Sequence, residues 1–71
     1  MKAMKKYWTL AVLQDNRWCV EFGDWDLDTV RDERAAMREG WENYKNSELK
    51  IFSTDGKQSS IDAMIAQYNA V

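Results

Sequence analysis

The feature that most constrains this 71-residue chain is a pair of apolar segments separated by a short polar turn. Residues 7–13 and 18–22 are rich in aromatic and aliphatic side chains, and residues 14–17 between them are polar. Asp15 and Asn16 tolerate the positive φ angles of a two-residue hairpin turn, so the sequence predicts a β-hairpin here. Three pairs of opposed residues follow from that turn: Leu13 with Trp18, Ala11 with Val20, and Thr9 with Phe22.

The first strand of this hairpin is apolar on both faces. Side chains alternate between the two faces of a strand, and Trp8, Leu10 and Val12 are as apolar as their neighbours at odd positions. A strand that is buried on only one face normally alternates apolar and polar residues. The sequence therefore places this strand in the centre of a sheet.

Two amphipathic helices and a third strand are predicted after the hairpin. Asp26 is the N-cap of the first helix, in which apolar side chains recur at spacings of three and four to about residue 45. Residues 48–54 form the third strand. Ser59 and Asp62 have the spacing of a capping box, which predicts the start of the second helix.

The element order ββαβα predicts an α+β fold. A right-handed crossover through the first helix makes the third strand parallel to the second, so it can lie beside the first. The expected sheet is three-stranded and antiparallel, in the order 2-1-3, and we expect both helices to pack on one face of it. Residues 1–71 form a single small domain in this prediction, with residues 1–5 as a flexible basic tail.

Composition argues against several function classes. The chain has no His and one cysteine, Cys19, so it lacks the ligands of the usual structural zinc sites and a base to activate the thiol. Its carboxylates show no pairing that would tune an acid and a base. We therefore expect no enzyme, no cofactor and no metal.

Charge and hydropathy bear on partners and location. Nucleic-acid binding favours a basic stripe, and a net charge of −2 does not indicate one. We therefore expect no direct nucleic-acid binding. The apolar segments are too short to span a membrane. A single cysteine that forms no internal disulfide is compatible with a reducing compartment, so we expect a cytoplasmic protein.

The strongest functional signal is the hairpin face that two helices on the other side would leave open. An exposed apolar patch on a small domain usually marks an interface, for a partner protein or for a second copy of the chain. The alternative is that the N-terminal tail or the helix ends cover it. The predicted patch consists of Trp8, Leu10, Val12, Cys19 and Phe52.

Acidic side chains gather around the start of the first helix. Calcium-loop spacing is present, but Thr29 and Ala35 stand where such a loop needs Gly and Glu, so we expect no metal. The helix dipole alone favours acidic side chains at a helix start. The alternative is that these residues form a second contact surface, which binds a basic surface on a partner. The acidic residues are Asp24, Asp26, Asp28, Asp32 and Glu33.

The loop before the second helix is a candidate anion site. Gly56, Lys57, Ser59 and Ser60 lie at a helix N-terminus, where backbone N–H groups can hold a phosphate. Arg34 lies within the apolar stripe of the first helix. It is either a snorkelling side chain, with its guanidinium in water or paired with Glu33 or Asp32, or a contact for a partner or an anion. An ordinary capped turn is the alternative for the loop, because it lacks Walker A spacing.

Short segments over most of the chain resemble small proteins encoded by phages and prophages. These are FGDWD at 22–26, VRDER at 30–34, KIFSTDGKQ at 50–58, IDA at 61–63 and NA at 69–70. In size and acidity the chain is also similar to phage inhibitors of host defence, such as anti-CRISPR proteins.

This resemblance implies a non-enzymatic module in the cytoplasm of a bacterial host that binds and blocks a host protein. A defence protein or a nucleic-acid-binding protein would be the partner, and a homo-oligomer is one expected form. Two alternatives stay open. One is an anion- or nucleotide-binding module that uses residues 56–60, and the other is a structural or regulatory phage accessory protein.

Overall fold

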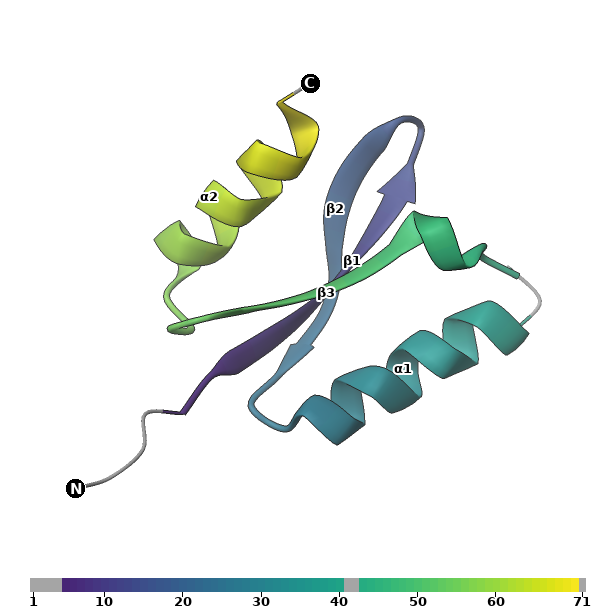
Figure 1. Cartoon of the computed structure of the whole chain (residues 1–71), viewed down its shortest axis with the longest axis horizontal. Coiled ribbons are helices and arrows are strands. Elements are labelled where there is room, and N and C mark those ends of the chain that lie inside the picture. The colour runs from purple at the N-terminus through teal and green to yellow at the C-terminus, as the bar shows by residue number, and fades with distance from the viewer. Residues whose placement is uncertain (1–4, 41–42, 71) are drawn as a thin grey trace.

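The computed structural model describes residues 5–40 and 43–70, so residues 1–4 of the predicted tail lie outside it. The strands form one antiparallel sheet in the order β2-β1-β3 (Figure 1), which confirms the predicted α+β topology with the most apolar strand in the centre. The elements are β1 (Tyr7–Gln14), β2 (Arg17–Asp24), α1 (Leu27–Glu39), a 3-10 turn η1 (Asn46–Glu48), β3 (Leu49–Thr54) and α2 (Gln58–Asn69).

The β1–β2 hairpin closes through the predicted two-residue turn. Asp15 and Asn16 have φ angles of 52° and 65°, the left-handed conformation that a primed turn requires at both positions. This turn matches the right-handed twist of the two strands. The predicted pairs of Leu13 with Trp18 and of Ala11 with Val20 are confirmed.

A β-bulge changes the register in the second half of the hairpin. The register shifts between Leu10 and Ala11, which leaves Glu21 of β2 without a partner, so that Phe22 pairs with Leu10. The predicted pairing of Phe22 with Thr9 is therefore wrong. One extra residue moves a side chain to the other face of a sheet, and Phe22 consequently joins the side of the sheet that carries Leu10.

The two helices cover opposite faces of the sheet, which Figure 1 shows almost edge-on. Val30 of α1 packs with Leu10 and Val12, whereas Ile61 of α2 packs with Ala11. Neighbouring residues of a strand point to opposite faces, so each helix covers one face of β1. The prediction that both helices pack on a single face is wrong.

The two-sided apolar character of β1 explains this arrangement. Fully burying one aliphatic side chain stabilises a fold by about 1.5–3 kcal/mol, so an uncovered face would forfeit several such contributions. The connection through α1 covers one face, and α2, which follows β3, lies on the other. Both apolar faces of the central strand thereby leave water.

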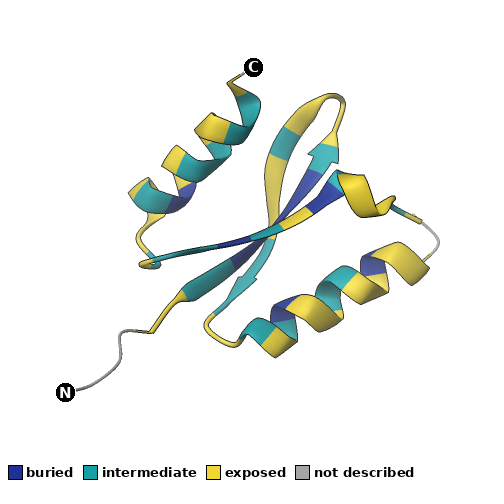
Figure 2. Ribbon diagram, viewed as in Figure 1, coloured by how far each residue is buried: buried dark blue, intermediate teal, exposed yellow. Residues whose placement is uncertain are grey.

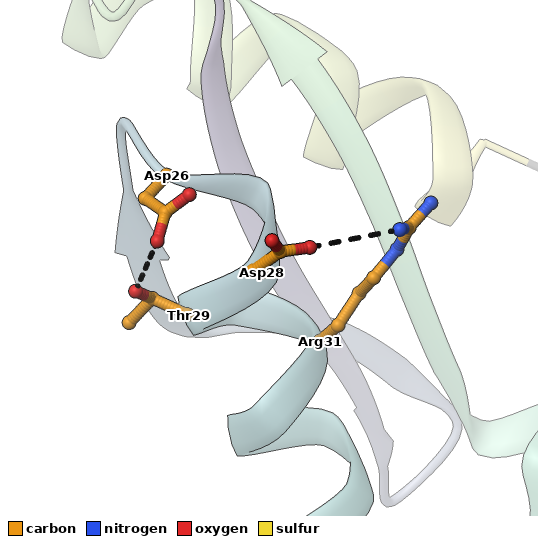
Figure 3. A network of polar contacts seen from close by, with 4 residues as sticks. All are labelled: Asp26, Asp28, Thr29 and Arg31. Atoms are coloured by element: carbon orange, nitrogen blue, oxygen red, sulfur yellow. Dashed lines mark hydrogen bonds and ion pairs between the residues drawn. The ribbon is translucent and has the colours of Figure 1, made fainter.

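The helix boundaries differ from the predicted ones at two ends, the end of α1 and the start of α2. Asp26 is the N-cap of α1 as predicted, but its carboxylate accepts the Thr29 hydroxyl at 2.8 Å and no helix N–H (Figure 3). Gly40 ends α1 before its predicted end, consistent with the low helix propensity of glycine. Helix α2 begins after Lys57, so a capping box at Ser59 is not formed.

The last residue of α2 closes part of the free edge of β2. Asn69 accepts a hydrogen bond from the Trp18 backbone N–H at 2.7 Å and donates one to the Trp18 carbonyl at 3.1 Å. The side-chain amide thus takes the place of a neighbouring strand at this residue. This contact also shows that the backbone groups of Trp18 point away from β1.

We expect Thr9→Val to raise the free energy of unfolding by about 1 kcal/mol, because it removes a buried hydroxyl that makes no hydrogen bond. Thr9 is fully buried, and its hydroxyl oxygen has no hydrogen-bond partner among residues 5–40 and 43–70. Urea unfolding of both proteins measures the difference. Thr29→Val is the matched control: it removes a hydroxyl that is bonded to Asp26, and we expect it to lower stability. A less stable Thr9→Val variant would contradict the prediction.

Candidate binding surfaces

Most of the predicted apolar interface is buried (Figure 2). Leu10, Val12 and Phe52 are exposed by only 0%, 1% and 6%, and Trp8 is half-buried, whereas Cys19 is exposed. The prediction that these five residues form one exposed patch is wrong. Helix α1 covers the face of Leu10 and Val12, and Phe52 lies on the other face, in the cluster that includes α2.

The acidic residues before and within the first turn of α1 engage nearby groups of the chain. The Asp24 carboxylate accepts the backbone N–H of Asp26 at 2.8 Å, and Asp26 accepts the Thr29 hydroxyl. Asp28 lies 3.8 Å from Arg31 across one helical turn (Figure 3). These contacts order the start of the helix. In the described part of the chain, no three His, Cys, Asp or Glu side chains are grouped to hold a metal ion.

The remaining two predicted acidic residues lie on different flanks of α1. Asp32 is four residues after Asp28, so the two side chains share one ridge of the helix. Asp32 is exposed, whereas Glu33 is half-buried on another side. The five acids therefore do not form one continuous patch.

The predicted anion site at the start of α2 is occupied by a carboxylate of the chain itself. Asp55 accepts the backbone N–H of Lys57 at 2.9 Å. That hydrogen bond, aided by one from the Ser60 side chain, holds the pKa of Asp55 below its ordinary value. An incoming phosphate would have to displace this negative charge.

The other residues predicted for the anion site serve different purposes or lie elsewhere. Gly56 has a φ of 89°, and a Cβ there would lie 2.6 Å from the Trp25 ring, so glycine is needed for the turn and for this packing. Lys57 and Ser59 are exposed. Arg34 belongs to α1, on the opposite side of the sheet, and the structure does not bring it to the turn.

Arg34 is held beside the start of β3. Its guanidinium donates to the backbone carbonyl of Asn46 at 3.3 Å and to the Asn46 side-chain oxygen. Asn46 begins η1, which leads directly into β3. Pairing with an acid of α1 is one predicted alternative, but the guanidinium bonds to Asn46, and this contact fixes the arginine next to the sheet.

Three arginines form a basic stripe along α1. Arg31, Arg34 and Arg38 are spaced by three and four residues, which places them on one side of the helix. With Ala35 and Glu39 they line an open hollow of about 400 Å³. We call Arg31, Arg34 and Arg38 the arginine stripe. The net charge conceals it, although the spacing of the three residues is visible in the sequence.

Neither a known protein family, nor a curated protein, nor a solved structure matches this chain. No helix within residues 5–40 and 43–70 has the length and apolar character needed to cross a membrane.

We expect Leu10→Glu to prevent folding, because it places a charge in a fully buried position between the sheet and α1. Far-UV circular dichroism and urea unfolding measure the loss of secondary structure and of cooperative unfolding in this variant. Val20→Glu, at a residue of the edge strand that is 49% exposed, is the control and should remain folded. A folded Leu10→Glu protein with an altered association state would restore the predicted interface.

We expect the Asp55 carboxyl to titrate below pH 3.8 in the native protein and to move toward 3.8 in Ser60→Ala. Because the native pKa of Asp55 lies below the unfolded value of 3.8, the ionised carboxylate stabilises the fold above pH 3.8. This contribution to stability is lost as the pH falls through the native pKa. NMR titration of the carboxyl groups in both proteins measures the pKa of Asp55 in each. A wild-type Asp55 carboxyl that titrates at or above pH 3.8 would contradict this prediction.

Proposed function

We propose that this protein acts by binding another macromolecule, not by catalysis, and that the arginine stripe of α1 is its main contact. The observation that carries the proposal is the row of Arg31, Arg34 and Arg38 around an open hollow on a protein of net negative charge. Guanidinium groups bind carboxylates through paired hydrogen bonds, which gives both affinity and orientation.

The stripe is partly pre-organised for such a contact. Asn46 holds the guanidinium of Arg34, so this side chain has lost rotamer freedom before a partner arrives. Arg31 remains 65% exposed and makes a long contact with the exposed Asp28, and Arg38 is exposed. One fixed and two accessible arginines suit a partner surface with several carboxylates.

The acidic ridge beside the stripe adds the opposite charge. Asp28 and Asp32 are exposed and lie along the same helix. A partner surface with acidic groups opposite the stripe and basic groups opposite this ridge would be selected over a uniformly charged one. The resemblance to phage proteins supports a host protein as that partner, and the similarity to inhibitors of host defence supports a blocking effect in the bacterial cytoplasm.

Anion binding at the start of α2 is less well supported. The Asp55 carboxylate already accepts the Lys57 N–H there, and a second negative charge would be repelled. We therefore prefer a macromolecular partner at α1 to a small anion at residues 56–60.

Affinity capture from a bacterial lysate tests the proposal. The double variant Arg31→Gln/Arg38→Gln should fail to capture proteins that the wild type captures. Capture by the wild type should also weaken as the salt concentration rises, because salt screens exposed charges. Lys5→Gln/Arg17→Gln is the control: it changes the net charge equally at exposed residues outside α1. Equal capture by both double variants would refute the stripe as the contact.

A further inference from the structure

Strand β3 has an open outer edge. The order β2-β1-β3 places it at one side of the sheet, and Figure 1 shows it crossing the front of the molecule, where neither helix covers it from the viewer's side. An unpaired strand edge offers backbone N–H and C=O groups to another strand.

The hairpin geometry identifies the free backbone groups of β3. The residues that flank a two-residue turn form a hydrogen-bonded pair, and alternate residues of the central strand then face β2 and β3 in turn. Even-numbered residues of β1 face β2, so Thr9 faces β3 and its partner Phe52. The backbone groups of Ile51 and Ser53 consequently point outward, and within the described residues no side chain bonds to them.

The opposite edge of the sheet is protected in ways that β3 is not. On β2, Asn69 bonds to the outward groups of Trp18, and a bulge interrupts the strand at Glu21. Both features discourage pairing with another chain. The β1–β3 register runs without a bulge over all six residues of β3.

The charged residue within β3 does not protect its edge either. Lys50 is exposed, but its ammonium group lies 4.9 Å from the ring centre of Trp18 and 4.7 Å from that of Tyr68. Trp18 belongs to β2, so the lysine side chain extends back across the sheet, away from the open edge.

The arginine stripe gives this edge a positive flank. Arg34 contacts Asn46, three residues before β3, so the stripe runs along the side of α1 that faces this end of the strand. A second copy that paired through β3 would place both helices α1 on one face of a joined sheet, with their stripes toward each other. Repulsion disfavours that dimer, whereas acidic side chains on an added strand would be attracted.

We propose that the outer edge of β3 accepts an extended acidic segment of the partner protein as a fourth strand. Ile51 and Ser53 supply the backbone hydrogen bonds, and the arginine stripe contacts the carboxylates on the α1 side of the added strand. This inference rests on the proposed function and specifies the chemistry of the partner.

Amide hydrogen exchange by NMR tests the edge directly, with a synthetic peptide of alternating Glu and Thr as the probe. Exchange at Ile51 and Ser53 should slow about tenfold with peptide at ten times its Kd, since binding depletes the open state in proportion to 1 + [L]/Kd. A matched peptide of alternating Lys and Thr should leave both amides unchanged.

Ser53→Pro supplies the matched variant. Proline removes the outward N–H and should leave the β1 pairing intact, because edge strands accept proline where the N–H faces solvent. We expect this variant to keep the near-UV spectrum of the wild type and to lose protection of Ile51 by the Glu-Thr peptide. Ser53→Thr retains the N–H and should behave as the wild type does.

Several outcomes would overturn the proposal. These are equal protection by the Lys-Thr peptide, absence of protection by the Glu-Thr peptide, and a wild-type dimer in light scattering that Ser53→Pro abolishes, which would identify a second copy as the occupant. If lysate capture still required Arg31 and Arg38 while the peptide left β3 unprotected, the edge proposal alone would fail. Arginine-independent capture would instead refute the proposed function.

Discussion

The burial of β1 on both faces is the constraint on which the rest of the structure depends. Leu10 and Val12 pack under α1, and Ala11 packs under α2, so the middle of the central strand, residues 9–12, is buried on both faces. In so small a domain few other apolar contacts exist to replace these, and each helix is required for one half of the core. The three-stranded sheet separates the two core clusters, and each strand contributes side chains to both.

This division of the core determines which surfaces remain for a partner. Once each helix covers one face, most of the apolar surface of the central strand is buried, and the accessible surfaces include the outer side of α1 and the outer edge of β3. Arg34 joins these two regions, because its guanidinium reaches Asn46 beside the start of β3. Through Arg34, the charged side of α1 therefore approaches the end of β3 at which its open edge begins.

Several features could be predicted because they depend on neighbouring residues alone. Asp15 and Asn16 predict the turn through their tolerance of positive φ, and the alternation in β1 predicts its central place. The bulge could not be predicted, since Glu21 is polar and fits either an edge position or an unpaired one. The Asn69 contact with Trp18 joins residues far apart in the chain, and no local pattern indicates it.

The sequence by itself determined the elements, their order and the need to cover β1. Only the tertiary structure decided that the helices take opposite faces, because amphipathic helices fit either side of a strand that is apolar on both. That decision buries Leu10, Val12 and Phe52 and removes them as a binding surface. It also places Arg34 of α1 beside Asn46 at the start of the segment that leads into β3, a proximity that depends on packing and not on spacing along the chain.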